Sequence, residues 1–453
     1  MKLSFYGASQ QISGSCYLLE SDTSKLLVDC GLFQCQKVCE AQNHEPFPFD
    51  PAKITGVVVT HAHTDHTGRI PKLFKDGFKG KVYSTPPTKD LAAIMLADSL
   101  SLMIKEAERE EGPVLFSQDH VDRALANWET HEYGHEFRLD DFHVRLLDAG
   151  HVLGSAMIEI LFKDKDGVPQ KIVFSGDLGN PPIPLLPPPA KVTDANILVV
   201  ETTYGNRSHE MHGDRKIKLE RAIEETVKKK GVLMIPAFSL ERTQEILFEL
   251  HDLIENGRVP HVPVFLDSPL AIRITEIYRK YDHYFNKKAR YIIDSGDKIF
   301  KFSMLTFTLA TEESKAINDV SPPKIIIAGS GMSTGGRILH HERRYLPDPN
   351  SILLLVGYQA AGSLGRKIQD GAKEVDIFGN TVPVRAQVVR IQGYSAHPDQ
   401  DGLMEFVHDS YNSLEKVFAV HGEPDASLFF VQRIRDYMGI HAYAPHLGES
   451  FDI

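Results

Sequence analysis

Residues 57–68 read VVVTHAHTDHTG, and this stretch is the strongest feature of the sequence. Three valines end an expected strand, and four metal-binding side chains follow within six residues: His61, His63, Asp65 and His66. A strand end points successive side chains apart and the turn after it brings the next ones round, so these groups can surround two adjacent cations. Imidazole and carboxylate are ligands that suit zinc. A histidine-rich loop without ligands is the alternative, and the HxHxDH spacing after a strand argues against it.

Two later segments carry groups of the same kind. Residues 150–155, GHVLGS, place His151 in a glycine-flanked turn after an expected strand. Residues 172–179, IVFSGDLG, place Asp177 at the end of a buried strand. Alone, these would be a core histidine and a turn aspartate. In order with the first segment, they read as a third imidazole and a bridging carboxylate.

The motifs HAHTDH, GHVLGS and FSGDLG together resemble the metallo-β-lactamase superfamily. The resemblance implies two packed β-sheets with helices outside and metals at the sheet edges. It implies that one metal is held by His61, His63 and His151, and a second by Asp65 and His66, with Asp177 bridging. Residues 27–31, LVDCG, match the first motif of the family, in which an aspartate, here Asp29, supports the ligands from behind.

Three segments narrow the resemblance to the β-CASP subfamily of nucleases. Residues 199–205 (VVETTYG), 392–397 (QGYSAH) and 420–423 (VHGE) look like its motifs A, B and C. Carried over, His421 completes the second metal, which gives seven ligand positions in all. A histidine at motif C resembles the RNA-processing branch. The catalytic residues implied by the resemblance are Asp29, Asp65, Glu201 and His397, with His397 as a general acid oriented by Glu201.

The expected elements predict two kinds of domain. Up to about residue 205, short β-branched runs alternate with turns and one long helix at 88–111. From about residue 214, helical stretches alternate with buried strand-like runs, which predicts a mostly parallel sheet flanked by helices. Strand character returns at 382–391.

With the resemblance, these elements give an α/β fold class: a metallo-β-lactamase αββα sandwich with an inserted β-CASP domain. The expected ranges are 1–205 for the first part of the metallo-β-lactamase domain, 206–385 for the β-CASP domain and 386–453 for the C-terminal return.

Composition is that of a soluble globular protein with more than one domain. The 453 residues exceed one ordinary core, and 42% are hydrophobic and 25% charged. No stretch resembles a signal peptide, and no apolar run approaches the roughly 20 residues that span a membrane. We therefore expect a cytoplasmic protein. The net charge of −11 excludes a general coat for nucleic acid, so such a site must be a local basic cleft or rely on metal ions.

The four cysteines favour ordinary thiols over a structural metal clip, because no second matched pair follows them. They are Cys16, Cys30, Cys35 and Cys39.

The inserted segment carries candidate groups for RNA phosphates. Residues 329–337, GSGMSTGGR, follow an expected strand and offer backbone amides, with a structural tight turn as the alternative. Residues 362–367, GSLGRK, offer a hydroxyl and a guanidinium. A lone arginine is otherwise a surface ion-pair residue. The residues expected to bind substrate are Arg242, Ser330, Ser333, Ser363 and Arg366.

These features predict a ribonuclease with two zinc ions, and manganese is the alternative metal. Two cations about 3.5–4 Å apart share a hydroxide that attacks phosphorus, and loss of the 3′ oxygen leaves 3′-hydroxyl and 5′-phosphate ends. We expect mainly endonuclease action on single-stranded RNA, with 5′-exonuclease action as a second mode. No membrane partner is expected, and a homodimer is left open. The alternatives are a small-molecule ester or thioester hydrolase, against which the large insert argues, and a non-catalytic RNA-processing scaffold, against which the filled ligand positions argue.

Overall fold

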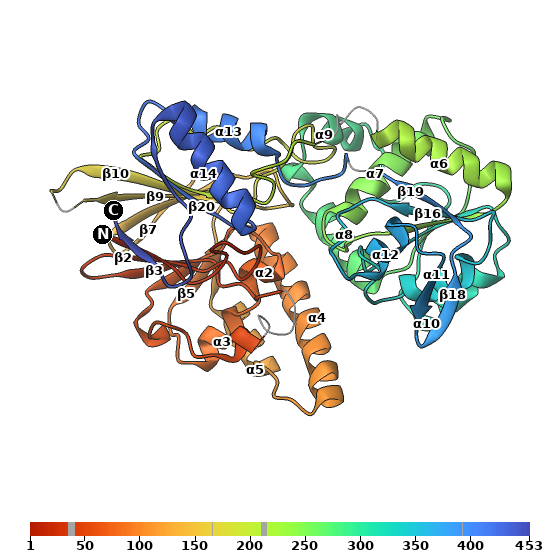
Figure 1. Ribbon diagram of the computed structural model, residues 1–453, viewed down its shortest axis with the longest axis horizontal. Helices are drawn as coiled ribbons and strands as arrows, with labels where there is room; N and C mark the ends of the chain where they lie inside the picture. The colour runs from red at the N-terminus through yellow and green to blue at the C-terminus, as the bar shows by residue number, and fades with distance from the viewer. Residues whose placement is uncertain (35–40, 165, 210–214, 392) are drawn as a thin grey trace. The chain divides into compact units, whose positions relative to one another are not determined.

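The computed structural model describes the chain except for residues 35–40, 165, 210–214 and 392 (Figure 1). The chain divides into two compact units, Met1–Ser208 with Ala396–Ile453, and His209–Ser395. Of the four cysteines, Cys35 and Cys39 lie outside the described residues, whereas Cys16 and Cys30 are buried free thiols.

The first unit contains two seven-stranded sheets. In spatial order, the strands of the first sheet are β22 (Ser450–Asp452), β1 (Lys2–Phe5), β2 (Tyr17–Glu20), β3 (Lys25–Val28), β4 (Gly56–Val58), β5 (Lys81–Ser84) and β6 (Trp128–Thr130). Neighbours are antiparallel from β22 to β3 and parallel from β3 to β6.

The second sheet repeats this arrangement. Its strands in order are β21 (His441–Tyr443), β20 (Lys416–Val420), β11 (Ile197–Glu201), β10 (Pro169–Phe174), β9 (Ala156–Lys163), β8 (Phe142–Asp148) and β7 (Glu136–Leu139). Neighbours are parallel from β21 to β10 and antiparallel from β10 to β7. Each sheet therefore has a parallel half whose strands end at one edge.

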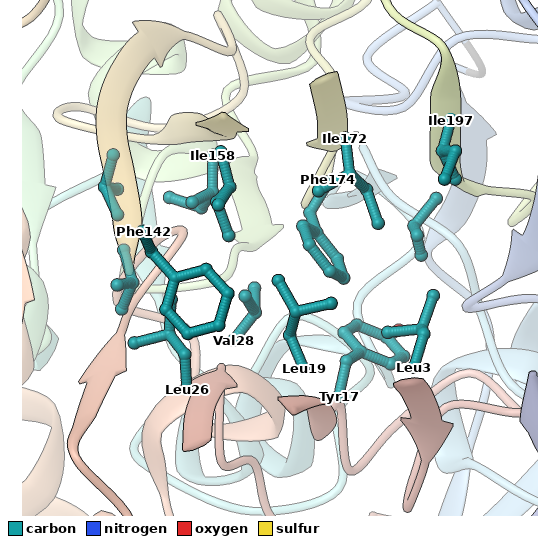
Figure 2. Close-up of a cluster of buried hydrophobic side chains, with 14 of the residues drawn as sticks. Leu3, Tyr17, Leu19, Leu26, Val28, Phe142, Ile158, Ile172, Phe174 and Ile197 are labelled. Carbon is teal, nitrogen blue, oxygen red and sulfur yellow. The ribbon is translucent and has the colours of Figure 1, made fainter. Parts of the chain in front are cut away.

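The main core lies between the two sheets. Because side chains alternate along a strand, every second residue points inward. Figure 2 shows Leu19, Leu26 and Val28 of the first sheet facing Phe142 and Ile158 of the second, and all are buried. The outer face of the second sheet is covered by α13 (Gln400–Asp409) and α14 (Pro424–Met438).

The helices that follow the parallel strands of the first sheet are α2 (Thr64–Thr67), α3 (Ile70–Lys75), α4 (Pro86–Glu110) and α5 (Gln118–Ala126). Helix α4 begins at a clear cap, because the Thr85 hydroxyl accepts a hydrogen bond from the Thr88 amide and two prolines occupy its first turn. It corresponds to the helix expected at 88–111. Among the described residues, no helix combines the length and apolar character that crossing a membrane requires.

The second unit is built on a six-stranded sheet whose neighbouring strands are all parallel. Its strands in order are β14 (Leu305–Phe307), β13 (Val264–Leu266), β15 (Lys324–Ala328), β12 (Val232–Pro236), β16 (Ile352–Leu355) and β19 (Gln387–Arg390). The helices are α6 (Arg215–Lys229), α7 (Arg242–Glu255), α8 (Pro269–Lys280), α9 (Lys287–Asp294), α10 (Thr311–Ala316), α11 (Ile338–Tyr345) and α12 (Leu364–Gln369). This confirms the predicted parallel sheet flanked by helices.

The strand expected at 382–391 is two strands. Strand β18 (Asn380–Pro383) pairs with β17 (Glu374–Ile377) in a separate hairpin, whereas β19 pairs with β16. Between them the amides of Arg385 and Ala386 both donate to the Leu346 carbonyl, which turns the chain from one sheet to the other. A run of β-branched residues does not reveal such a change of partner.

Candidate metal centre

The carboxyl ends of parallel strands gather the candidate residues of the first unit. Asp29 follows β3, His61 follows β4, Asp177 follows β10, Glu201 ends β11 and His421 follows β20. Parallel neighbours end at the same sheet edge, so residues far apart in sequence meet there.

The loop that carries His63, Asp65 and His66 is anchored by main-chain contacts. Ser15 N–H donates to the Asp65 carbonyl at 2.9 Å, and Cys30 N–H donates to the His66 carbonyl at 2.8 Å. Gly31 allows this approach, because a Cβ there would lie 1.5 Å from the Asp65 carbonyl oxygen. The loop is therefore fixed from two directions.

A first group of donor atoms consists of His61 Nε2, His63 Nδ1, His151 Nε2 and Asp177 Oδ2. His61 Nε2 lies 2.9 Å from His63 Nδ1 and 3.5 Å from Asp177 Oδ2. His151 Nε2 lies 3.4 Å from His63 Nδ1 and 3.6 Å from Asp177 Oδ2. Four donors thus enclose one small space.

A second group faces the other oxygen of the same carboxylate. His66 Nε2 lies 3.3 Å from Asp177 Oδ1 and 3.8 Å from Asp65 Oδ2. His421 Nε2 lies 3.7 Å from Asp65 Oδ2 and 3.8 Å from Asp177 Oδ1. Asp177 therefore lies between the groups, with one oxygen toward each. All seven positions expected to bind metal converge here.

The spacing and burial of these atoms fit metal cations. Ligands of a tetrahedral zinc at about 2.0–2.1 Å lie about 3.3 Å from one another. The donor distances above are close to that value. Asp177 Oδ1 and His66 Nε2 are buried, and neither has a hydrogen-bond partner among the described residues. Such atoms are costly to bury unless an ion or a water molecule satisfies them.

Electrostatics also favour cations. Burial lowers the pKa of His61 and His151 well below the usual range, so both imidazoles are neutral and offer lone pairs. Burial opposes ionisation of Asp177, but the imidazoles of His421 and His66 hold its pKa well below normal. Burial opposes a charge on His66 as well, yet Asp177, Asp29 and Asp65 raise its pKa well above normal. The carboxylates thus favour positive charge at this point.

Asp29 supports the centre from behind. Its Oδ1 accepts the Thr60 amide at 2.8 Å, and its Oδ2 accepts the Thr60 hydroxyl at 2.8 Å and lies 2.7 Å from His66 Nδ1. On the other side, Ser15 Oγ lies 3.1 Å from His421 Nδ1. These contacts orient the rings so that the Nε2 atoms face inward. Sequence reasoning missed both hydroxyls: Thr60 directly precedes His61, but no local pattern links Ser15 to a histidine 406 residues away.

We expect Asp29→Asn to weaken metal binding by about 10- to 100-fold, because the amide loses the charge that orients His66. Competition with a fluorescent zinc chelator measures this affinity. Asp22→Asn, at an exposed position just before β3, is the control and should bind metal like the parent chain. Unchanged metal affinity in Asp29→Asn would show that Asp29 does not support the metal ligands.

His397 and Glu201, expected from the sequence as a general acid and the carboxylate that orients it, also lie together. His397 Nδ1 lies 3.0 Å from both carboxylate oxygens of Glu201, and the His397 ring centre lies 4.8 Å from that of His151. Glu201 is buried and its Oε1 accepts the Leu178 amide at 2.7 Å, next to Asp177. His397 is therefore held beside the donor groups with its Nε2 directed away from Glu201.

Arg242, expected to bind substrate, is buried in the second unit. Its guanidinium pairs with Glu245, lies 3.6 Å from Glu241 and stands over the ring of Tyr394 at 5.3 Å. Arg215 stands over the same ring at 5.3 Å. The structure thus gives Arg242 a set of internal partners that the sequence did not reveal, and an RNA contact by this residue stays a prediction.

We expect Arg242→Ala to lower the free energy of unfolding by about 3–5 kcal/mol, because it leaves buried carboxylates without their cation. Urea unfolding measures the loss, and Arg242→Ala combined with Glu245→Gln should recover part of it. Arg273→Ala, at an exposed position on α8, is the control and should change stability by about 0.5 kcal/mol or less. Weaker RNA binding at unchanged stability would contradict this internal role.

The other predicted substrate residues lie on two loops of the second unit. The hydroxyl of Ser330 accepts the Thr334 and Gly335 amides, so part of the backbone expected to cradle phosphate is already bonded. The Ser333 hydroxyl is buried and donates to Glu342 at 2.5 Å.

Burial raises the pKa of Glu342 to about 7, against the Ser333 hydrogen bond that lowers it. Ser363 caps α12, and Arg366 lies 2.9 Å from Asp370 at the surface. RNA binding by these residues stays a prediction.

Comparison with known families covers most of the chain. Residues 10–237 match the family described as the metallo-beta-lactamase superfamily, and residues 243–368 match the Beta-Casp domain. Residues 381–445 match the Zn-dependent metallo-hydrolase RNA specificity domain.

Several named proteins are similar to this chain over nearly its whole length. Ribonuclease TTHA0252 of Thermus thermophilus is 37% identical over 94% of each chain. The RNase J-like protein of Methanocaldococcus jannaschii is 33% identical over 100% of this chain and 99% of its own length. Transcription termination factor FttA of Methanosarcina mazei is 32% identical over 94% of this chain and 67% of its own.

A solved structure of a protein of unknown function from Enterococcus faecalis superposes with a TM-score of 0.60 at 12% identity, covering 100% of this chain and 99% of that one. At that identity it supports the fold alone.

Proposed function

This chain belongs to the β-CASP family of the metallo-β-lactamase superfamily, and from that premise we propose that it is a metal-dependent ribonuclease acting on single-stranded RNA. The observation that carries the proposal is the pair of donor groups that share Asp177, with the His397–Glu201 pair beside them. The ribonucleases among its relatives support the choice of RNA.

The proposed cofactors are two Zn²⁺ ions, with Mn²⁺ as the alternative. His61, His63 and His151 would hold one ion, Asp65, His66 and His421 would hold the other, and Asp177 would bridge them. When bound, such ions lower the pKa of water and offset charge on a phosphate.

The reaction needs a proton for the leaving oxygen, and His397 is the proposed donor. Glu201 orients the imidazole through Nδ1 and is itself held by the Leu178 amide, so Nε2 is the atom that gives up the proton. Protonation of the ribose 3′ oxygen on departure leaves 3′-hydroxyl and 5′-phosphate ends. We propose mainly endonuclease cleavage, with 5′-exonuclease action as a second mode.

The deciding experiment incubates metal-loaded protein with single-stranded RNA labelled at either end and maps the product ends. Internal cuts with 5′-phosphate products are expected. Products with 2′,3′-cyclic phosphates would exclude the proposed route, and release of mononucleotides alone would exclude endonuclease action. A chromogenic carboxylic ester tests the small-molecule alternative, and an inert protein that binds RNA would support the scaffold. Location in the cytoplasm and assembly as a homodimer are further proposals.

A further inference from the structure

Two large aromatic side chains stand exposed at one edge of the second unit. Phe238 lies two residues beyond β12 and is 42% exposed, and Tyr358 lies three residues beyond β16 and is 50% exposed. Strands β12 and β16 are parallel neighbours, so both loops leave the sheet at the same carboxyl edge. Two exposed aromatic rings that are not part of the hydrophobic core therefore lie on neighbouring loops.

The Phe238 ring is held in place by main chain. A Cβ at Gly331, in the loop after β15, would lie 2.8 Å from Phe238 Cδ2, so only glycine lets the ring lie against that loop. A Cβ at Gly357, in the loop after β16, would lie 3.7 Å from Phe238 Cε2. The ring therefore rests on two loops and still keeps much of its surface open.

The topology of the sheet marks the same place. Strands β15 and β12 lie next to each other in the sheet. From β12 the chain crosses β15 to reach β13, whereas from β15 it crosses β12 in the opposite direction to reach β16. In open parallel sheets, ligands bind outside the carboxyl ends of strands where the connections diverge in this way. Phe238 and the 329–337 loop leave the sheet at this point.

Charge distinguishes the second unit from the rest of the chain. Residues 209–395 contain 27 Lys and Arg against 23 Asp and Glu, a net charge of +4. The remaining residues contain 23 Lys and Arg against 38 Asp and Glu, a net charge of −15. Within an acidic protein, the second unit is therefore the part that a polyanion approaches with least repulsion.

We propose that Phe238, Gly331, Gly357 and Tyr358 form an aromatic edge on which the bases of single-stranded RNA stack. The inference rests on the proposed function for the identity of the polymer and adds the residues that grip it. Exposed aromatic rings on which bases stack are one means by which proteins bind single strands without strong sequence preference. The half-buried Ser239 hydroxyl, 3.5 Å from that of Ser268, lies beside Gly329 at the same edge and offers a hydrogen-bond donor to the RNA backbone.

The test measures fluorescence anisotropy of a labelled 12-nucleotide uridine RNA with the full chain, which carries Asp177→Asn so that RNA is not consumed. Phe238→Ala and Tyr358→Ala should each raise the Kd by between about fivefold and 150-fold. Phe238→Trp should bind like its parent, and Gly331→Ala should weaken binding because it displaces the ring. Tyr291→Ala is the control, since it removes a ring 76% exposed on α9.

The outcomes separate the two proposals. Equal affinity in Phe238→Ala, Tyr358→Ala and the parent overturns the aromatic edge, as does a parent that does not bind RNA. If Phe238→Ala and Tyr358→Ala weaken the binding of an RNA without bases by the same factor, base stacking is also excluded. If ring removal leaves RNA affinity unchanged and instead dissociates a dimer in sedimentation, the edge serves self-association. If RNA binding depends on the rings but the metal-loaded parent chain without Asp177→Asn never cleaves RNA, the proposed nuclease activity is refuted and the aromatic edge is supported.

Discussion

We expect Asp177→Ala to abolish RNA cleavage, with a loss of at least about 10³-fold, because several kcal/mol of charge stabilisation would depend on this carboxylate. No other described side chain places one oxygen toward each donor group, at 3.5 Å from His61 Nε2 and 3.3 Å from His66 Nε2. Its removal should reduce bound metal below two ions per chain. Elemental analysis of the purified protein and initial rates on single-stranded RNA measure both effects.

Asp194→Ala is the matched control, because that aspartate lies in the same unit but is exposed and pairs with Lys171 at the surface. It should keep full activity and metal content. Circular dichroism and thermal unfolding test whether Asp177→Ala remains folded. Full cleavage by folded Asp177→Ala would refute the metal centre.

His397→Ala should slow RNA cleavage by about 10²- to 10⁴-fold, the range that a positioned general acid contributes. Both metals should remain, since His397 Nδ1 is bonded to Glu201 and not to the shared Asp177. A substrate with a nitrophenolate leaving group needs no proton on departure. The variant should therefore hydrolyse a bis-nitrophenyl phosphate at nearly the parent rate while it fails on RNA.

Glu201→Gln provides the comparison for this prediction. It keeps a hydrogen bond to His397 but removes the charge, so its effect on RNA should be smaller than that of His397→Ala. Loss of metal from His397→Ala would make this histidine a ligand, and equal losses on both substrates would exclude the role of acid.

The sequence predicted the site best where several candidate metal ligands lie within one short motif. His61, His63, Asp65 and His66 share six residues, so their convergence follows from one strand end. The parallel sheet was also predicted, because buried strands and helices alternate visibly between Val232 and Leu355. Helix α13 was missed: it depends on the side chain of Asp399, which accepts the amides of Asp401 and Gly402, and Gly402 weakens the helical pattern.

The substrate residues were harder to place for a physical reason. An arginine next to a strand end looks the same in sequence whether it faces solvent or a buried acid. Arg242 meets Glu245, one turn along its own helix, and Tyr394, which is 152 positions away. Ser333 likewise turns inward to Glu342. Such partners are chosen by tertiary packing, which no local spacing encodes.

The pairing of strands that are distant in sequence constrains when the first unit can fold during translation. Strand β20, which carries His421 at its end, pairs with β11, and β22 pairs with β1 across nearly the entire chain. The donor groups of the first unit therefore cannot come together until the segment that carries His421 has been translated. Such pairing makes folding slow, because strands that are distant in sequence must find each other before the sheets are complete.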